Sequence, residues 1–187
     1  MRRPATPIAL LILALLALAA IATAVAVGSS GASLEALWPG ADGNALSRSI
    51  LLDLRLPRAL TAFGTGAVLA LAGLLMQALL RNPLADPYVL GVSGGAAVAA
   101  LGAMVLGLSG LWIDLGAAIG ALCAMLTVFA LARGPGGWTP TRLLLTGVVV
   151  ASGCGAMVSL LLALSDDARL KGMLFWLMGD LAYASSP

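Results

Sequence analysis

The sequence predicts an all-α integral membrane protein with five transmembrane helices. Of its 187 residues, 61% are apolar and only 10% are charged, whereas a soluble domain is about a quarter charged. The mean hydropathy is +1.06, so the chain cannot cover a water-facing surface and the bilayer is its expected solvent. The apolar residues also gather in five runs, which are separated by segments rich in Gly, Pro and charge.

Each apolar run is long enough to cross a bilayer, because about 20 helical residues span the ~30 Å hydrocarbon core. The first run follows Arg2 and Arg3, as in a signal peptide, but it is longer than the about 7–15 residues of such a region. We therefore interpret it as a transmembrane helix. The predicted spans are residues 7–27, 59–80, 88–108, 115–132 and 143–164.

Two longer segments, residues 28–58 and 165–187, are polar by the standard of this chain and are expected to lie outside the bilayer on one side. In the first we predict a loop with short interfacial helices around Leu34–Trp38 and Ala45–Leu54, since Trp38 suits the membrane interface. The second is polar at its start and amphipathic further on.

The basic residues do not decide the orientation by number. With the N-terminus inside, five Lys/Arg side chains fall on each side of the membrane, of ten in total, and the positive-inside rule counts only these. Arg2 and Arg3 beside the first span favour a cytoplasmic N-terminus, which makes both longer segments extracytoplasmic. Arg55 and Arg58 then lie outside, where the rule disfavours them.

Several function classes are not expected. The chain has no His, no paired carboxylate inside a span and no G-x-x-x-x-G-K-[ST] phosphate loop, so we predict neither an enzyme nor an ATP site. It has no Lys/Arg-rich run that could follow a nucleic acid. Cys123 and Cys154 lie in apolar runs and are expected to be small hydrophobic residues. We therefore expect no metal site and no cofactor bound by this chain.

A transport role fits the spans better. They carry many Gly, Ser and Thr residues, including G-x-x-x-G pairs at Gly91/Gly95 and Gly116/Gly120. Such residues allow close helix packing or line a wet pathway, and packing is the safer interpretation for any one span. No predicted span carries an ionisable residue in its interior, which disfavours an ion-coupled carrier and indicates that a partner supplies the energy.

The hinge between the second and third predicted spans reads R-N-P-L-A-D-P. Asp86 directly before Pro87 is a good helix start, because Asp accepts from free backbone N–H groups and Pro tolerates the first helical position. Pro83 ends or redirects the preceding helix, and Arg81 can reach the head groups. Together with Asn82 these residues predict a structural turn with a built-in helix start.

The string from Arg55 to Ala96, which opens R-L-P-R-A-L and ends R-N-P-L-A-D-P-Y-V-L-G-V-S-G-G-A, resembles the permease subunits of bacterial ABC importers for iron-siderophores, haem and vitamin B12, the FecCD family. R-L-L-L-T-G-V-V-V at 142–150 and F-W-L-M-G-D-L at 175–181 match in order and spacing. The resemblance covers essentially the whole chain.

This resemblance implies half of a ten-helix permease in the bacterial inner membrane. It implies a second permease copy or paired half, ABC ATPase subunits on the cytoplasmic face, and a periplasmic or lipoprotein substrate-binding protein outside. The family's coupling helix would lie beyond Pro187. The alternatives left open are a non-transporting membrane anchor or assembly protein, and an inactive permease fragment.

The resemblance also assigns residues. Arg55 and Arg58 match the family's pair that docks glutamates of the binding protein; the alternative for both is a helix-end anchor on head groups. The fifth span is placed beside the transport pathway. The candidate lining residues are Gln77, Thr146, Ser152 and Ser159.

Overall fold

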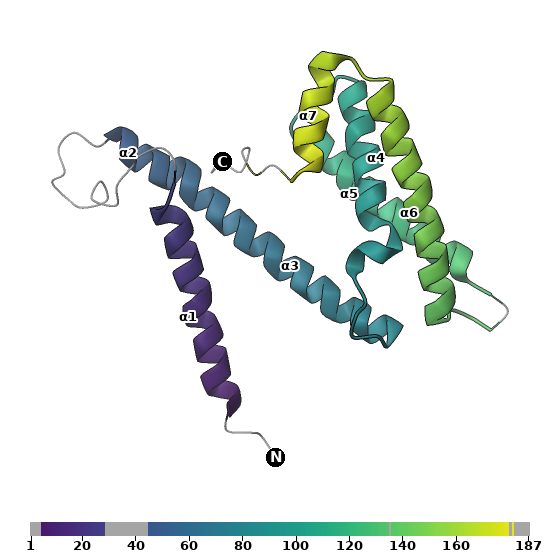
Figure 1. The fold of residues 1–187 in the computed structure, drawn as a ribbon, viewed down its shortest axis with the longest axis horizontal. Helices are drawn as coiled ribbons and strands as arrows, with labels where there is room; N and C mark the ends of the chain where they lie inside the picture. The colour runs from purple at the N-terminus through teal and green to yellow at the C-terminus, as the bar shows by residue number, and fades with distance from the viewer. Residues whose placement is uncertain (1–4, 29–44, 135, 180, 182–187) are drawn as a thin grey trace. The chain divides into compact units, whose positions relative to one another are not determined.

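The computed structural model describes residues 5–28, 45–134, 136–179 and 181. Within these residues the regular structure is helical, apart from an isolated bridge between Gly134 and Gly137. The chain divides into two compact units, residues 1–68 with 181–187, and residues 69–180. Figure 1 shows the helices of both. The predicted helix around Leu34–Trp38 lies outside the described residues.

The first unit begins with α1, Ala5–Ala26. Alanine and leucine, the strongest helix formers, dominate its sequence, and Pro7 lies in the first turn, where its missing N–H costs little. The hydroxyl of Thr23 donates to the carbonyls of Ala19 and Ala20, both at 2.9 Å, so the helix satisfies its own polar side chain.

A second long helical run follows, made of α2 (Ala45–Ser49), the π-helix η2 (Ile50–Arg55) and α3 (Leu56–Leu80). The separate short helix expected before residue 59 is thus continuous with the next span over 36 residues. The wide π-turn ends two residues before Pro57, whose ring would clash with the carbonyl one turn earlier in a regular α-helix. The π-turn therefore lets the helix continue through a proline.

The second unit contains η3 (Pro87–Leu90), α4 (Val92–Val105), α5 (Leu111–Ala132), α6 (Pro140–Ala163) and α7 (Asp167–Leu177). Helix α4 contacts α5, α6 and α7, and so forms the centre of this bundle (Figure 1).

One glycine from each G-x-x-x-G pair, Gly95 of α4 and Gly120 of α5, lies where these two helices meet. A Cβ placed on Gly95 would meet the carbonyl oxygen of Gly120 and, at 2.5 Å, the Cβ of Ala124. A Cβ placed on Gly120 would likewise meet the backbone of Gly95 and the Cβ of Ala99. The two helices are therefore as close as their backbones allow, which is the packing that small residues permit inside a membrane.

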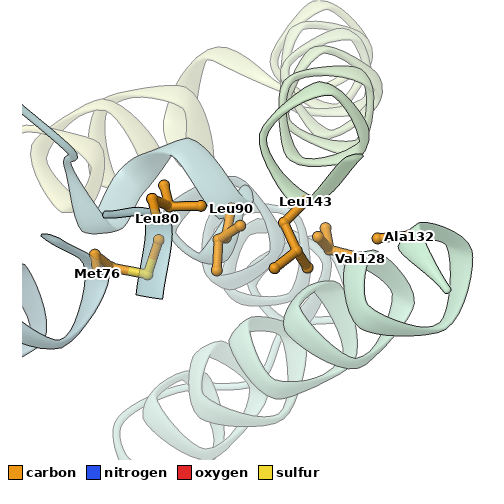
Figure 2. Packing of buried hydrophobic residues seen from close by; sticks show 6 residues of the cluster. All are labelled: Met76, Leu80, Leu90, Val128, Ala132 and Leu143. Atoms are coloured by element: carbon orange, nitrogen blue, oxygen red, sulfur yellow. The ribbon is translucent and has the colours of Figure 1, made fainter. Parts of the chain in front are cut away.

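An apolar cluster fills one end of the bundle. It lies where the end of α3, η3, the end of α5 and the start of α6 meet. Figure 2 shows its six side chains, all buried, which are Met76, Leu80, Leu90, Val128, Ala132 and Leu143. The cluster holds both flanks of the predicted hinge, because Leu80 precedes it and Leu90 follows it.

In the described part of the chain, four helices are long and apolar enough to cross a membrane: 7–26, 45–80, 111–132 and 140–163. The predicted span 88–108 differs, since the chain breaks at Gly91 (φ 70°) and α4 is only 14 residues long. At about 1.5 Å per residue α4 is about 21 Å long, shorter than the ~30 Å hydrocarbon core. The left-handed backbone of Gly91 ends η3 and redirects the chain into α4.

Candidate functional site

The hinge between α3 and η3 is held by its own hydrogen bonds. Arg81 has a left-handed backbone (φ 49°), as is common for the residue that follows a helix end. Asn82 donates its backbone N–H to the carbonyl of Gln77 at 3.2 Å, and its Oδ1 accepts from the N–H of Leu84 at 3.0 Å. The N–H of Ala85 closes a turn on the carbonyl of Asn82 at 3.1 Å. The turn around Pro83 is therefore built from the local sequence.

The Asp86–Pro87 pair begins η3. Asp86 has an extended backbone, and its Oδ1 accepts from the N–H of Tyr88 at 2.7 Å, while Pro87 occupies the first turn. This is a capped helix start, although the helix is one short 3-10 turn, not a long span. The side-chain oxygens of Asn82 and Asp86 both accept from backbone N–H groups of the hinge. The hinge therefore has the geometry of a structural turn between two helices.

The chain after Asp86 is fixed against α6. A Cβ on Gly147 would meet the carbonyl oxygen of Val89 and, at 3.1 Å, the Cα of Leu90. Both are backbone atoms, which cannot move aside by a side-chain rotation. Gly147 thus allows η3 to lie directly on α6 and places Leu90 in the apolar cluster.

Arg55 and Arg58 differ in their surroundings. Arg55 is half-buried, and its Nη1 donates to the carbonyls of Val25 at 3.0 Å and Ala26 at 3.1 Å, at the end of α1. Arg58 is exposed, and its Nε donates to the carbonyl of Leu181 at 3.3 Å. Both line an open groove of about 610 Å³ between the end of α1, η2 and the start of α3.

The candidate lining residues do not form one group. Ser152 and Ser159 are exposed and lie about two turns apart on α6, so they share one face of that helix. Leu143 and Gly147 are buried on the opposite face. Thr146 lies at the flank of the buried face, half-buried, and Gln77 is half-buried near the end of α3.

Each α6 hydroxyl on that exposed face is satisfied within the helix. Ser152 donates to the carbonyl of Val148 at 2.8 Å, and Ser159 donates to that of Gly155 at 3.0 Å. A hydroxyl bonded in this way can face lipid, protein or water without an unpaired donor.

Residues that secure helix ends were not anticipated from the sequence. Trp138 donates its indole N–H to the carbonyl of Phe129 near the end of α5 at 2.8 Å, with Arg133 5.9 Å from the ring centre. Arg169 donates from Nη1 to the carbonyl of Val105, the last residue of α4, at 2.6 Å. The available signal was an Arg or Trp soon after a break between two helices. In the described part of the chain, no three His, Cys, Asp or Glu side chains gather as a metal site would require.

The sequence is similar to known permeases over most of its length. It is 39% identical over 164 residues to the hemin transport system permease protein HmuU of Yersinia pestis, covering 84% of this chain and 48% of that protein. It is 39% identical over 156 residues to the vitamin B12 import system permease protein BtuC of Vibrio vulnificus, covering 80% of this chain and 46% of that protein.

The fold is also similar to that of a known transporter. A solved structure described as an inward-facing metal-chelate type ABC transporter matches 96% of this chain and 55% of its own, with a TM-score of 0.81 and 30% identity. The chain thus spans about half the length of these relatives. The model of the FecCD transport family matches residues 9–187, which confirms the resemblance carried by the hinge and its flanks. The chain therefore belongs to the FecCD transport family.

Proposed function

We propose that this chain is the N-terminal half of a permease subunit of an ATP-driven importer, which moves iron-siderophore, haem or cobalamin-type chelates across the bacterial inner membrane. The observation that carries the proposal is the match to a transport family over residues 9–187. The names of the relatives, which concern hemin and vitamin B12, support the substrate class.

Energy comes from separate ABC ATPase subunits on the cytoplasmic face. The predicted spans carry no ionisable residue in their interiors, whereas ion-coupled carriers usually need one near the middle of the membrane. A second permease copy or a paired half completes the pathway. The N-terminus is cytoplasmic, so α2, η2 and the start of α3 face the outside.

Docking of a loaded substrate-binding protein takes place at the surface that carries Arg55 and Arg58. The exposed guanidinium of Arg58 suits a carboxylate partner, because Arg presents several donors in a rigid fork. Docking of the binding protein and ATP-driven closure of the ATPase subunits then tilt the helices, and the central path opens to each side of the membrane in turn. Ser152 and Ser159, on the exposed face of α6, lie beside this path.

The docking step is tested by charge reversal in the full-length permease. With Arg58→Glu we expect the Kd for the binding protein to rise at least about tenfold at low salt, because a reversed charge at a complementary interface repels its partner. Affinity is measured with the permease in lipid nanodiscs, at several salt concentrations.

Arg48→Glu is the matched control, since Arg48 is also an exposed arginine of the first unit and its reversal changes the net charge equally. We expect little change there. Equal Kd values for Arg58→Glu and the unmodified permease would show that Arg58 takes no part in docking.

The proposal also predicts genes for a P-loop ATPase and a secreted binding protein near this one, and a reading frame with five further spans beyond Pro187. A non-transporting anchor or an inactive fragment needs none of these. The coding DNA therefore separates the two functions.

A further inference from the structure

The end of α1 contains carbonyl groups that the helix itself cannot satisfy. The last four carbonyls of any α-helix lack an intrahelical donor, and such groups are costly where water is scarce. In this chain the Nη1 of Arg55 donates to two of them, at Val25 and Ala26, from a residue far along the sequence. A cation at this position also complements the negative end of the helix dipole.

An apolar contact supports the same junction. Leu51, about one turn before Arg55 in η2, is fully buried, with Val25 and Ile50 packed against it. Neighbouring residues of η2 thus bind the end of α1 by burial and by hydrogen bonds. The π-turn contains both residues, Leu51 and Arg55.

Gly28 provides independent evidence. A Cβ at this position would lie 2.6 Å from the Cζ and Nη2 of Arg55 and 2.8 Å from its Nε. Gly28 is not among the glycines with positive φ, so its backbone does not require a glycine. The guanidinium of Arg55 instead occupies the space that a side chain at position 28 would fill, so a glycine is needed there.

We propose that Arg55 is a positioning residue that fixes the end of α1 on η2 before any partner binds, and that Arg58 is the arginine presented for docking. The assignment of Arg58 rests on the proposed function, whereas the role of Arg55 at α1 does not. Trp138 and Arg169 make the same kind of hydrogen bond at the ends of α5 and α4. A side-chain donor from a later segment secures the end of an earlier helix in each case.

The test measures hydrogen–deuterium exchange at the end of α1 in the full-length permease, in lipid nanodiscs without binding protein or ATPase. With Arg55→Ala we expect the amides of residues 24–27 to exchange about tenfold faster, the loss expected for hydrogen bonds from a charged donor. Arg55→Lys keeps the charge at the helix end and should give a smaller rise. Arg58→Ala should leave these amides unchanged.

Gly28→Val keeps Arg55 but fills the space of its guanidinium, so we expect faster exchange in the same amides. Slow exchange in α4–α6 would show that Arg55→Ala still folds. If Arg55→Ala folds poorly, Gly28→Val and Arg55→Lys still test the proposal. Exchange within twofold of the unmodified protein for both Arg55→Ala and Gly28→Val would overturn the proposal.

Binding-protein affinity is measured on the same variants in a separate assay. Weaker docking of Arg55→Ala with unchanged exchange in α1 would make Arg55 a contact residue and overturn its positioning role. Faster exchange together with unchanged docking of Arg58→Glu would support the role of Arg55 while contradicting the docking site. The two claims can therefore fail separately.

Discussion

Gly95→Ala is expected to destabilise the protein, whereas Gly102→Ala on the same helix is not. The added Cβ at position 95 would meet the carbonyl oxygen of Gly120 and, at 2.5 Å, the Cβ of Ala124. A Cβ at position 102 would have nothing within 4 Å. Since neither backbone nor Cβ can rotate away, α4 must move off α5, and overpacking of this kind costs about 1–3 kcal/mol.

The measurement is thermal unfolding in detergent for both variants. A chain of 150–250 residues loses about 2–4 °C in Tm for each kcal/mol, so Gly95→Ala should unfold several degrees lower. Gly102→Ala should be neutral or slightly stabilising, because alanine is the better helix former. Equal Tm values for the two variants would show that the close approach of α4 and α5 does not limit stability.

Gly147→Ala is expected to displace the end of η3 from α6. The Cβ would meet the carbonyl oxygen of Val89 and the Cα of Leu90, which are both backbone atoms. Leu90 is only 3% exposed within the apolar cluster, and full burial of a leucine contributes about 1.5–3 kcal/mol. We therefore expect a loss of about 1–3 kcal/mol from strain and partial exposure together.

Gly155→Ala is the control on α6, since a Cβ there has nothing within 4 Å. Thermal unfolding reports the stability, and hydrogen–deuterium exchange at Tyr88–Gly91 reports whether η3 has moved. If Gly147→Ala changed neither measurement more than Gly155→Ala does, the packing of η3 on α6 would not depend on this glycine.

The hinge shows what local sequence can predict. Asp86, Pro87 and Asn82 act on backbone groups within a few residues, so their roles follow from the residue types and their order. The break at Gly91 did not follow, because a glycine can continue a helix or adopt positive φ. Its left-handed backbone lies against α6, near Val150 and Ala151, and this contact is long-range.

The structure also differs from the prediction in the helix that contains Pro57. We predicted a short interfacial helix around Ala45–Leu54 and a span from residue 59, yet the π-turn η2 joins the two into one helix. Hydropathy counts apolar residues and does not report the change from α to π geometry. The length of the continuous helix was therefore underestimated.

The two arginines show the same limit. The charge count and the motif singled out Arg55 and Arg58 together, three residues apart. Their difference arises because α1 ends beside η2, about thirty residues away in sequence. A pattern on one helix cannot indicate which of its cations another helix end will use.

The central claim is that this chain forms part of an ATP-driven chelate importer, and uptake by the reconstituted complex tests it most directly. The full-length permease is placed in proteoliposomes with the ATPase and binding protein that we predict are encoded beside it, and accumulation of haem, cobalamin and a ferric siderophore is measured with and without ATP. We predict ATP-dependent uptake of at least one of these chelates, reduced by Arg58→Glu and not by Arg48→Glu. A permease that binds no ATPase and accumulates none of the three would contradict the account.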